Sequence, residues 1–235
     1  MGTDERAARV RTVRRRLAQD GPAGTRPREL DFETVTLPAR DCDLLRDLLI
    51  AEEVGTVVEI GLAYASSALA IGEALVTVDA PAARHVIIDP FQHSTYAGVG
   101  WDLMRAAGLD SIATLLVAPS SIALPRLVTD GLVADAAFVD GNHRFHEVFV
   151  DLYFLRKIVR PGGLIVLDDN WTPSIRTAVH YYQQNLGWTA IPGAFAGGTT
   201  KADGADPTAD PVIRCRAFRL PDVAVEPPFA SFHPF

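Results

Sequence analysis

The chain is poor in the features that mark several common classes of protein. Its 2 cysteines, Cys42 and Cys215, fit neither a metal-binding spacing nor a disulfide framework. No apolar run approaches the roughly eighteen residues that a membrane-spanning helix needs. The arginine-rich N-terminus also lacks the apolar segment of a secretion signal. We therefore expect a cytoplasmic protein without a membrane partner.

Positive charge is also scarce. The 235 residues hold 22 lysines and arginines against 29 acids, a net charge of −7, which argues against a nucleic-acid partner. Residues 1–28 are the exception, with eight arginines against three acids, or about +5. We predict a helical arm over 1–28, with Val10, Val13 and Leu17 as its apolar stripe. Two alternatives stay open: the arm contacts a second copy in a homodimer, or it is a solvated helix. The remaining domain is 29–235.

Short apolar runs alternate with helical patterns after the arm. The runs are nearly continuous, as is typical of strands buried on both faces of a parallel sheet. We predict an α/β fold with a doubly wound, Rossmann-like sheet, whose ligands bind at the carboxyl ends of the strands. The predicted strands are 56–61, 84–89, 113–118, 134–140, 163–169, 188–192 and 212–220. The predicted helices are 41–53 with Asp41 as N-cap, 66–77, 100–108, 121–130, 144–160 ended by Pro161, and one that starts with Thr172 as N-cap. Residues 193–211 are predicted to form a hairpin loop.

Carboxylates end four of the first five predicted strands. They are Glu59, Asp89, Asp140 and the pair Asp168–Asp169, which Asn170 follows. Unpaired carboxylates crowded at one sheet edge repel each other and resist burial. A binding or catalytic site at this edge is the simplest explanation.

The turn after the first strand narrows the choice of ligand. A dinucleotide site needs G-x-G-x-x-G there, but only Gly61 is present in Gly61-Leu62-Ala63-Tyr64-Ala65-Ser66. This disfavours a nicotinamide oxidoreductase. S-adenosylmethionine (SAM) fits better, because it needs a close backbone approach at Gly61 and an acid such as Asp89 for its ribose hydroxyls. The alternative, that the small residues serve only strand–helix packing, stays open on this turn alone.

Three segments carry a resemblance to a known family. They are "VVEIGLAYASSALAIGEAL", "HVIIDPFQ" and "FVDGNHRFHEVFVDLYFLRKIVRPGGLIVLDDNW". Together they resemble the class I SAM-dependent methyltransferases over about residues 41–190. The most similar branch is the small-molecule O-methyltransferases, including catechol O-methyltransferase and bacterial natural-product sugar methyltransferases. The resemblance implies a seven-stranded sheet with its last strand antiparallel, and methyl transfer from SAM.

The resemblance also implies roles for individual residues in binding SAM. Glu59 and Gly61 would lie near its methionine end, Ser67 near its carboxylate and Asp89 at the ribose. Phe91 and the pair Ser120–Ser121 would contact the adenine, and Ala63 and Asp140 complete the predicted cofactor set. Ala65 departs from the family pattern, because many members have glycine there.

The metal-dependent members of the family imply a Mg²⁺ site. Asp140 stands where they have their first acid. The second place is filled by Asp169 with Asn170, as in the catechol enzymes, or by Asp168 with Asp169, as in the sugar enzymes, and both sets stay open. Oxygen ligands of this kind suit Mg²⁺. His143 occupies the place of the catechol enzymes' catalytic lysine and is the predicted base, with Asp140 beside it.

We therefore predict a SAM-dependent methyltransferase that acts on a hydroxyl oxygen of a small molecule, a secondary metabolite, with Mg²⁺ assistance. Two alternatives stay open. One is a metal-independent N- or C-methyltransferase. The other is a non-catalytic SAM-fold binding protein.

Overall fold

The structure, a computed structural model, describes residues 2–22, 32–201 and 210–234. The chain divides into two compact units, Met1–Ala123 and Leu124–Phe235. The predicted boundary between residues 28 and 29 and part of the predicted loop 193–211 lie outside the described residues.

The first unit alternates short parallel strands with helices. Strand β1 pairs in parallel with β2, and β2 with β3. Strands β1 and β2 are nearly all buried, because apolar β-branched residues fill much of both faces, whereas only Ala113 of β3 is buried. The elements are α1 (Thr3–Asp20), α2 (Phe32–Val35), α3 (Ala39–Ala51), β1 (Thr56–Ile60), α4 (Ser66–Val78), β2 (Arg84–Ile88), α5 (Val99–Ala107), a 3₁₀ turn (Leu109–Ser111) and β3 (Ala113–Leu116). Helix α6 (Ser120–Thr129) begins in this unit and ends in the second.

The second unit holds the antiparallel part of the sheet. Strand β4 pairs in parallel with β5, and β9 runs antiparallel to both β5 and β6. The elements are β4 (Ala134–Val139), α7 (Phe145–Ile158), β5 (Val159–Leu167), α8 (Pro173–Leu186), β6 (Thr189–Ala190), β7 (Thr200–Lys201), β8 (Val212–Ile213) and β9 (Arg216–Arg219). The seven-stranded sheet has the order β3-β2-β1-β4-β5-β9-β6, so the predicted fold class is confirmed. Strands β7 and β8 pair separately as a two-stranded sheet, so the single strand predicted over 212–220 is wrong: it is divided into β8 and β9.

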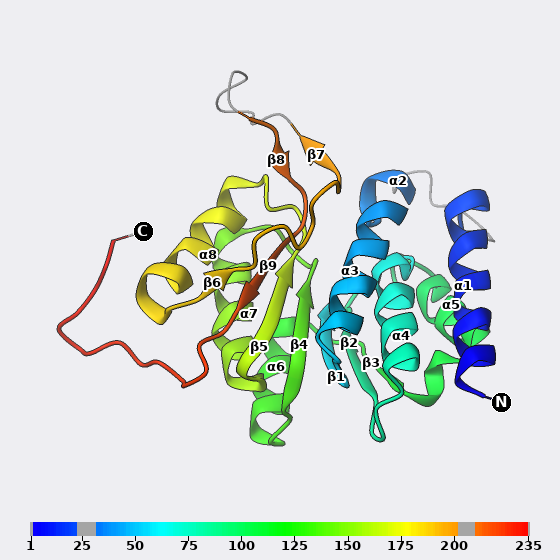
Figure 1. Cartoon of the computed structure of the whole chain (residues 1–235), viewed down its shortest axis with the longest axis horizontal. Coiled ribbons are helices and arrows are strands. Elements are labelled where there is room, and N and C mark those ends of the chain that lie inside the picture. Colours follow the sequence, from blue (N-terminus) through cyan, green and yellow to red (C-terminus); the bar gives the residue numbers. More distant parts are fainter. Residues whose placement is uncertain (1, 23–31, 202–209, 235) are drawn as a thin grey trace. The chain divides into compact units, whose positions relative to one another are not determined.

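The N-terminal arm belongs to the first unit. Helix α1 packs along α4 and α5 (Figure 1). Its stripe residues Val10 and Leu17 are buried, and Arg14 pairs with the buried Glu73 of α4 and, at 2.8 Å, with Asp43 of α3. The apolar stripe therefore already has a partner within the unit, and the homodimer stays a prediction.

Two predicted helix ends are wrong. Asp41 is not the N-cap of α3, because Pro38 holds that place and Asp41 is buried within the first turn. Helix α7 ends at Ile158 rather than at Pro161, since Val159 already begins β5. In the described ranges, we find no helix with the length and apolar character needed to cross a membrane.

Candidate functional site

The turn after β1 adopts a backbone path that normally requires glycine. Gly61 has a φ of +96°, and the two alanines Ala63 and Ala65 have φ values of +42° and +66°. An alanine in the left-handed region costs about 1–2 kcal/mol. Residue 65 therefore keeps a positive φ although it is alanine and not glycine. Surrounding contacts must offset the strain of this conformation.

Asp89, at the end of β2, supplies several of these contacts. Its Oδ2 accepts backbone N–H bonds from Leu62 at 3.1 Å and Ala63 at 3.0 Å, and its Oδ1 accepts the N–H of Phe91 at 2.7 Å. The residue is only 3% exposed. Asp89 thus fixes the turn before any ligand binds, and Oδ1 retains a free lone pair.

Gln92 is a second support of the turn, and sequence reasoning missed it. Its side-chain amide donates to the carbonyl of Ala63 at 3.0 Å and accepts the N–H of Trp101 in α5 at 3.3 Å. Gly100 allows this approach, because a Cβ there would lie 2.4 Å from the Ala63 oxygen. The only sequence signal was a polar residue just after a strand end.

Glu59 and Ser67, predicted near the methionine end of SAM, contact each other. The Ser67 hydroxyl donates to Glu59 Oε1 at 2.6 Å, and both residues are buried. His85 Nε2 lies 2.8 Å from Glu59 Oε2, which is ion-pair distance without hydrogen-bond geometry. These side chains tie the end of β1 to the start of α4, beneath the turn.

The predicted adenine contacts are more accessible. Phe91 is 57% exposed directly after β2. Ser120 and Ser121 are the first residues of α6, where backbone N–H groups have no helical partner. Both places suit contact with a planar, hydrogen-bonding ring.

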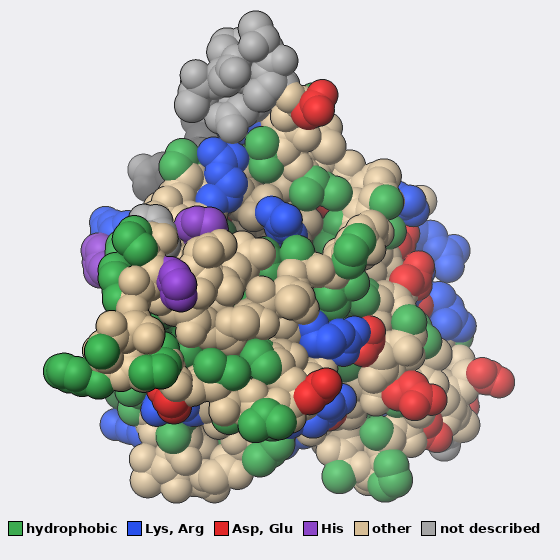
Figure 2. Space-filling view, turned by 60° about the vertical axis from the view of Figure 1, so that its left-hand side comes forward, with side chains coloured by type: hydrophobic (Ala, Val, Ile, Leu, Met, Phe, Trp, Pro, Cys, Tyr) green, Lys and Arg blue, Asp and Glu red, His purple; other side chains and the backbone are tan. Residues whose placement is uncertain are grey.

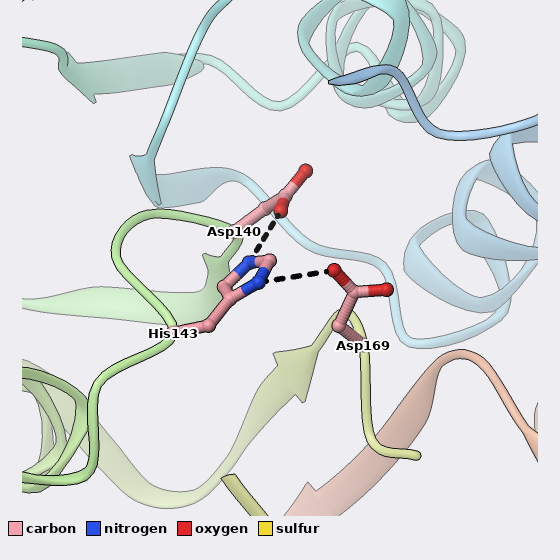
Figure 3. A group of neighbouring side chains, drawn as sticks. All are labelled: Asp140, His143 and Asp169. Atoms are coloured by element: carbon pink, nitrogen blue, oxygen red, sulfur yellow. Dashed lines mark ion pairs between the residues drawn. The ribbon is translucent and has the colours of Figure 1, made fainter. Parts of the chain in front are cut away.

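In the second unit, the strand ends bring together Asp140, His143 and Asp169 (Figure 3). His143 Nε2 lies 3.5 Å from Asp140 Oδ1, and Nδ1 lies 3.2 Å from Asp169 Oδ2. One ligand atom of each residue lies within 4.8 Å of the others. Asp169 has a φ of +47°, a strained backbone for a non-glycine residue. We call these three residues the acid–histidine cluster.

The cluster has unusual protonation properties. Burial, and next the charge of Asp168, raise the pKa of Asp140 to about 7. The pKa of Asp169 is raised for the same two reasons. The hydrogen bond with Asp140 raises the pKa of His143, although burial opposes it. The cluster can therefore exchange protons near neutral pH.

Asp168 pairs with Arg214, whose Nε also lies 3.8 Å from Asp169 Oδ1 of the cluster. Arg214 donates to Asp168 from Nε, at 2.8 and 3.1 Å, and from Nη2 at 2.7 Å. The thiol of Cys215 lies 3.3 Å from its Oδ1. Asp168 is fully buried, so this pair occupies both carboxylate oxygens. Sequence reasoning missed Arg214, because nothing local links it to a residue 46 positions earlier.

Two further contacts shape the surroundings of the cluster. Ser174, in the first turn of α8, donates to the carbonyl of His143 at 2.6 Å and anchors the loop after β4. Asn170 is buried, and its side-chain nitrogen lies 3.5 Å from the carbonyl of Ile213. Its amide oxygen remains available as an acceptor.

The donor set of the cluster fits a divalent cation. Two carboxylates and an imidazole are ligands that Mg²⁺, Mn²⁺ or Zn²⁺ accept in proteins. Burial and the neighbouring charge of Asp168 disfavour the ionised form of both carboxyl groups, and a bound cation would offset this.

Comparison with known proteins agrees with this arrangement. Residues 58–170 match the family described as "Methyltransferase domain". The fold is similar to that of an O-methyltransferase from Bacillus cereus in complex with SAH, with a TM-score of 0.61, 12% identity, and coverage of 92% of this chain and 90% of that one. It is also similar to the O-methyltransferase TomG from Streptomyces achromogenes, involved in tomaymycin synthesis and in complex with SAM, with a TM-score of 0.57, 18% identity, and coverage of 92% and 89%. No curated protein matches the sequence.

The matched segment begins within β1 and ends at Asn170, so it includes both the strained turn and the acid–histidine cluster. Residues 58–170 are thus similar to the methyltransferase domain family, and the seven-stranded sheet with its antiparallel last strand agrees with this similarity.

Proposed function

We propose that the protein transfers the methyl group of SAM to a hydroxyl oxygen of a small molecule. The observation that carries the proposal is the acid–histidine cluster at the strand ends of the second unit. A methyltransferase that acts on a hydroxyl needs a group to accept the hydroxyl proton. His143, between two carboxylates, can do this.

In this proposal the first unit binds the cofactor. The turn with Gly61 and Ala63 offers a close backbone approach, and Asp89 Oδ1 accepts a ribose hydroxyl. Phe91, Ser120 and Ser121 contact the adenine. The buried pair Glu59 and Ser67 supports the turn from beneath, so their role is positional rather than direct contact.

The second unit activates the acceptor. The imidazole of His143 takes the hydroxyl proton while the oxygen attacks the methyl carbon of SAM. One C–O bond forms, the C–S bond breaks, and S-adenosylhomocysteine (SAH) leaves with both electrons of that bond. Asp140 and Asp169 stabilise the resulting imidazolium, in keeping with the raised pKa of His143.

Asp140 and Asp169, with the side-chain oxygen of Asn170, would hold Mg²⁺, and His143 beside them would act as the base. A bound dication would lower the pKa of the acceptor hydroxyl. Asp168 is the weaker candidate ligand because Arg214 occupies both its oxygens. This supports the Asp169–Asn170 set over the Asp168–Asp169 set.

The acceptor class is part of the proposal. The involvement of TomG in tomaymycin synthesis supports an acceptor from natural-product biosynthesis. A metal-independent N- or C-methyltransferase and a non-catalytic SAM-binding protein are the competing functions.

A thermal melt with SAM, SAH or NAD⁺, each with Mg²⁺ or EDTA, tests the cofactor first. A ligand at a hundredfold its Kd adds about 2.7 kcal/mol, which raises the Tm of a chain this size by about 5–10 °C. We expect the shift with SAM and SAH and none with NAD⁺. No shift with SAM would refute the proposal.

Transfer of a labelled methyl group to hydroxyl, amine and carbon acceptors then separates the competing functions. Transfer to hydroxyls that falls with EDTA supports the proposal in full. Transfer only to nitrogen or carbon, or SAM binding without transfer, supports one of the alternatives.

A further inference from the structure

A pocket with polar side chains lies in the second unit, between helix α8 and strand β9, with a volume of about 310 Å³. Its polar lining contains no aspartate or glutamate, although the chain carries 29 acids. The polar side chains that line it are Asn170, Arg176, Thr177, His180, Gln183 and Arg216.

The sequence places these groups on facing elements. Arg176, His180 and Gln183 follow one another at steps of four and three residues, so they share one face of α8. Arg216 is the first residue of β9 and lies opposite Leu167, the last residue of β5. The pocket therefore opens at the carboxyl edge of the sheet, where the acid–histidine cluster also lies.

The positive charge of the pocket is not neutralised at Arg216. Its guanidinium lies 5.5 Å from the ring centroid of Phe218, a cation–π contact that orients the group and leaves its donors available. In the described part of the chain, the side chains of Arg216 and His180 have neither an ion pair nor a hydrogen bond. Figure 2 shows histidine, lysine and arginine side chains gathered at the upper left of the face that it brings forward.

An oxyanion is the chemical complement of this lining. Guanidinium groups bind carboxylate and phosphate through paired N–H bonds, and an imidazole and amide side chains add donors. In a chain with a net charge of −7, an unpaired arginine in a pocket without acids marks a place where negative charge can come from a ligand.

The pocket is adjacent to the cluster along the chain. Asn170 lines the pocket and directly follows Asp169, so their Cα atoms are about 3.8 Å apart. We propose that this pocket binds a carboxylate or phosphate group of the methyl acceptor, whose hydroxyl lies at the cluster. Only the assignment to the acceptor rests on the proposed function; the anion site does not.

The anion site is tested first, without SAM. Full-length protein is titrated with inorganic phosphate, and separately with benzoate, at constant ionic strength while NMR follows the backbone amides. We expect saturable shifts confined to α8, β9 and Asn170, with affinity at least tenfold weaker in Arg216→Gln. Lys157→Gln is the matched control, because it removes a cation 4.7 Å from the ring of Tyr153 elsewhere in this unit. Shifts that are equal in Arg216→Gln and wild type overturn the proposal.

The acceptor assignment is tested by methyl transfer to a hydroxylated carboxylic acid, its phosphate analogue and its uncharged amide. Arg216→Gln should raise KM at least tenfold for the preferred anion and less than twofold for the amide. If no acceptor is methylated but phosphate binding depends on Arg216, the proposed function fails and the anion site stands. If acceptors are methylated and Arg216→Gln has no effect on either anion, the site is refuted and the function stands.

Discussion

Asp89 in the first unit and Asp140 in the second both follow a buried parallel strand, but their surroundings differ. Asp89 accepts three backbone N–H bonds from the turns around it. Asp140 instead lies beside His143, and burial, followed by the charge of Asp168, raises its pKa to about 7. The same place in the fold can therefore hold a fixed acceptor or a proton-exchanging group. The backbone donors within reach decide which.

The largest effect should come from removing the proposed base, His143, which lies beside Asp140 in the second unit. His143→Gln should lower the rate of methyl transfer about 10²–10⁴-fold, because the variant has no base to take the proton of the substrate hydroxyl. SAM affinity should change less than twofold, since the proposed cofactor residues lie in the first unit. Single-turnover rates and calorimetric titration with SAM measure the two. His146→Gln is the control, on an exposed histidine three residues further on, and an equal loss in that variant would contradict the assignment.

The next prediction removes the cation that pairs with the buried Asp168. Arg214→Met leaves a fully buried carboxylate unpaired and should lower the free energy of unfolding by about 3–5 kcal/mol. Chemical denaturation measures this. Arg216→Met, two residues further along but exposed, should cost less than about 1 kcal/mol. Similar losses in both variants would show that the Asp168 pair is not the cause.

The Asp140→Asn variant tests the raised pKa of Asp140 through the pH dependence of the free energy of unfolding. The pKa of Asp140 is raised from 3.8 to about 7, so its contribution to stability is greatest below pH 3.8 and is lost as the pH rises to about 7. The pKa of His143 is also raised, so its contribution is present below 6.5 and is lost as the pH rises through the folded value. Both groups therefore lower the free energy of unfolding as the pH rises.

Asp140→Asn should therefore gain stability relative to wild type between pH 4 and pH 8, on the order of 1–3 kcal/mol. We discount the full pKa difference because the Asp140 side chain is 19% exposed. Unfolding in a pH series, without divalent cations, measures the difference. Asp110→Asn, an exposed change in the first unit, should show a flat difference, and a flat curve for Asp140→Asn would contradict the raised pKa.

On the other side of the comparison, Asp89→Asn turns one acceptor into a donor that faces backbone N–H groups. We expect a loss of about 1–3 kcal/mol in stability and SAM affinity at least tenfold weaker. Calorimetry with SAM and denaturation measure both, with Asp110→Asn again as the control. Unchanged SAM affinity in a folded Asp89→Asn protein would remove Asp89 from the cofactor site.

The smallest effect should follow Ala63→Gly. Glycine relieves the left-handed strain at this position but loses more entropy on folding, so stability should stay equal or rise by up to about 1 kcal/mol. Ala8→Gly, at an exposed position within α1, should instead lose about 1 kcal/mol. Equal losses in both variants would mean that the turn is not strained.

Much of this arrangement could be predicted from the sequence. The continuous apolar runs at 56–61 and 134–140 predicted buried strands, and the acids that end them predicted a site at one edge. Contacts between side chains that lie far apart in the sequence could not be predicted in this way. That Arg214 neutralises Asp168, and that Gln92 bridges Ala63 and Trp101, depends on packing between segments that no local pattern connects. The positive φ values of Ala63 and Ala65 run against alanine's own preference, so they too were unpredictable.

The packing of α1 has a consequence for the order of events during synthesis. Arg14 finds its partner Glu73 only 59 residues later in the chain, and the apolar face of α1 is covered by the helix that contains this glutamate. During synthesis, α1 must therefore wait with Val10 and Leu17 uncovered until α4 has emerged from the ribosome. During that interval, a chaperone that binds apolar segments between arginines has its best opportunity to bind the nascent chain.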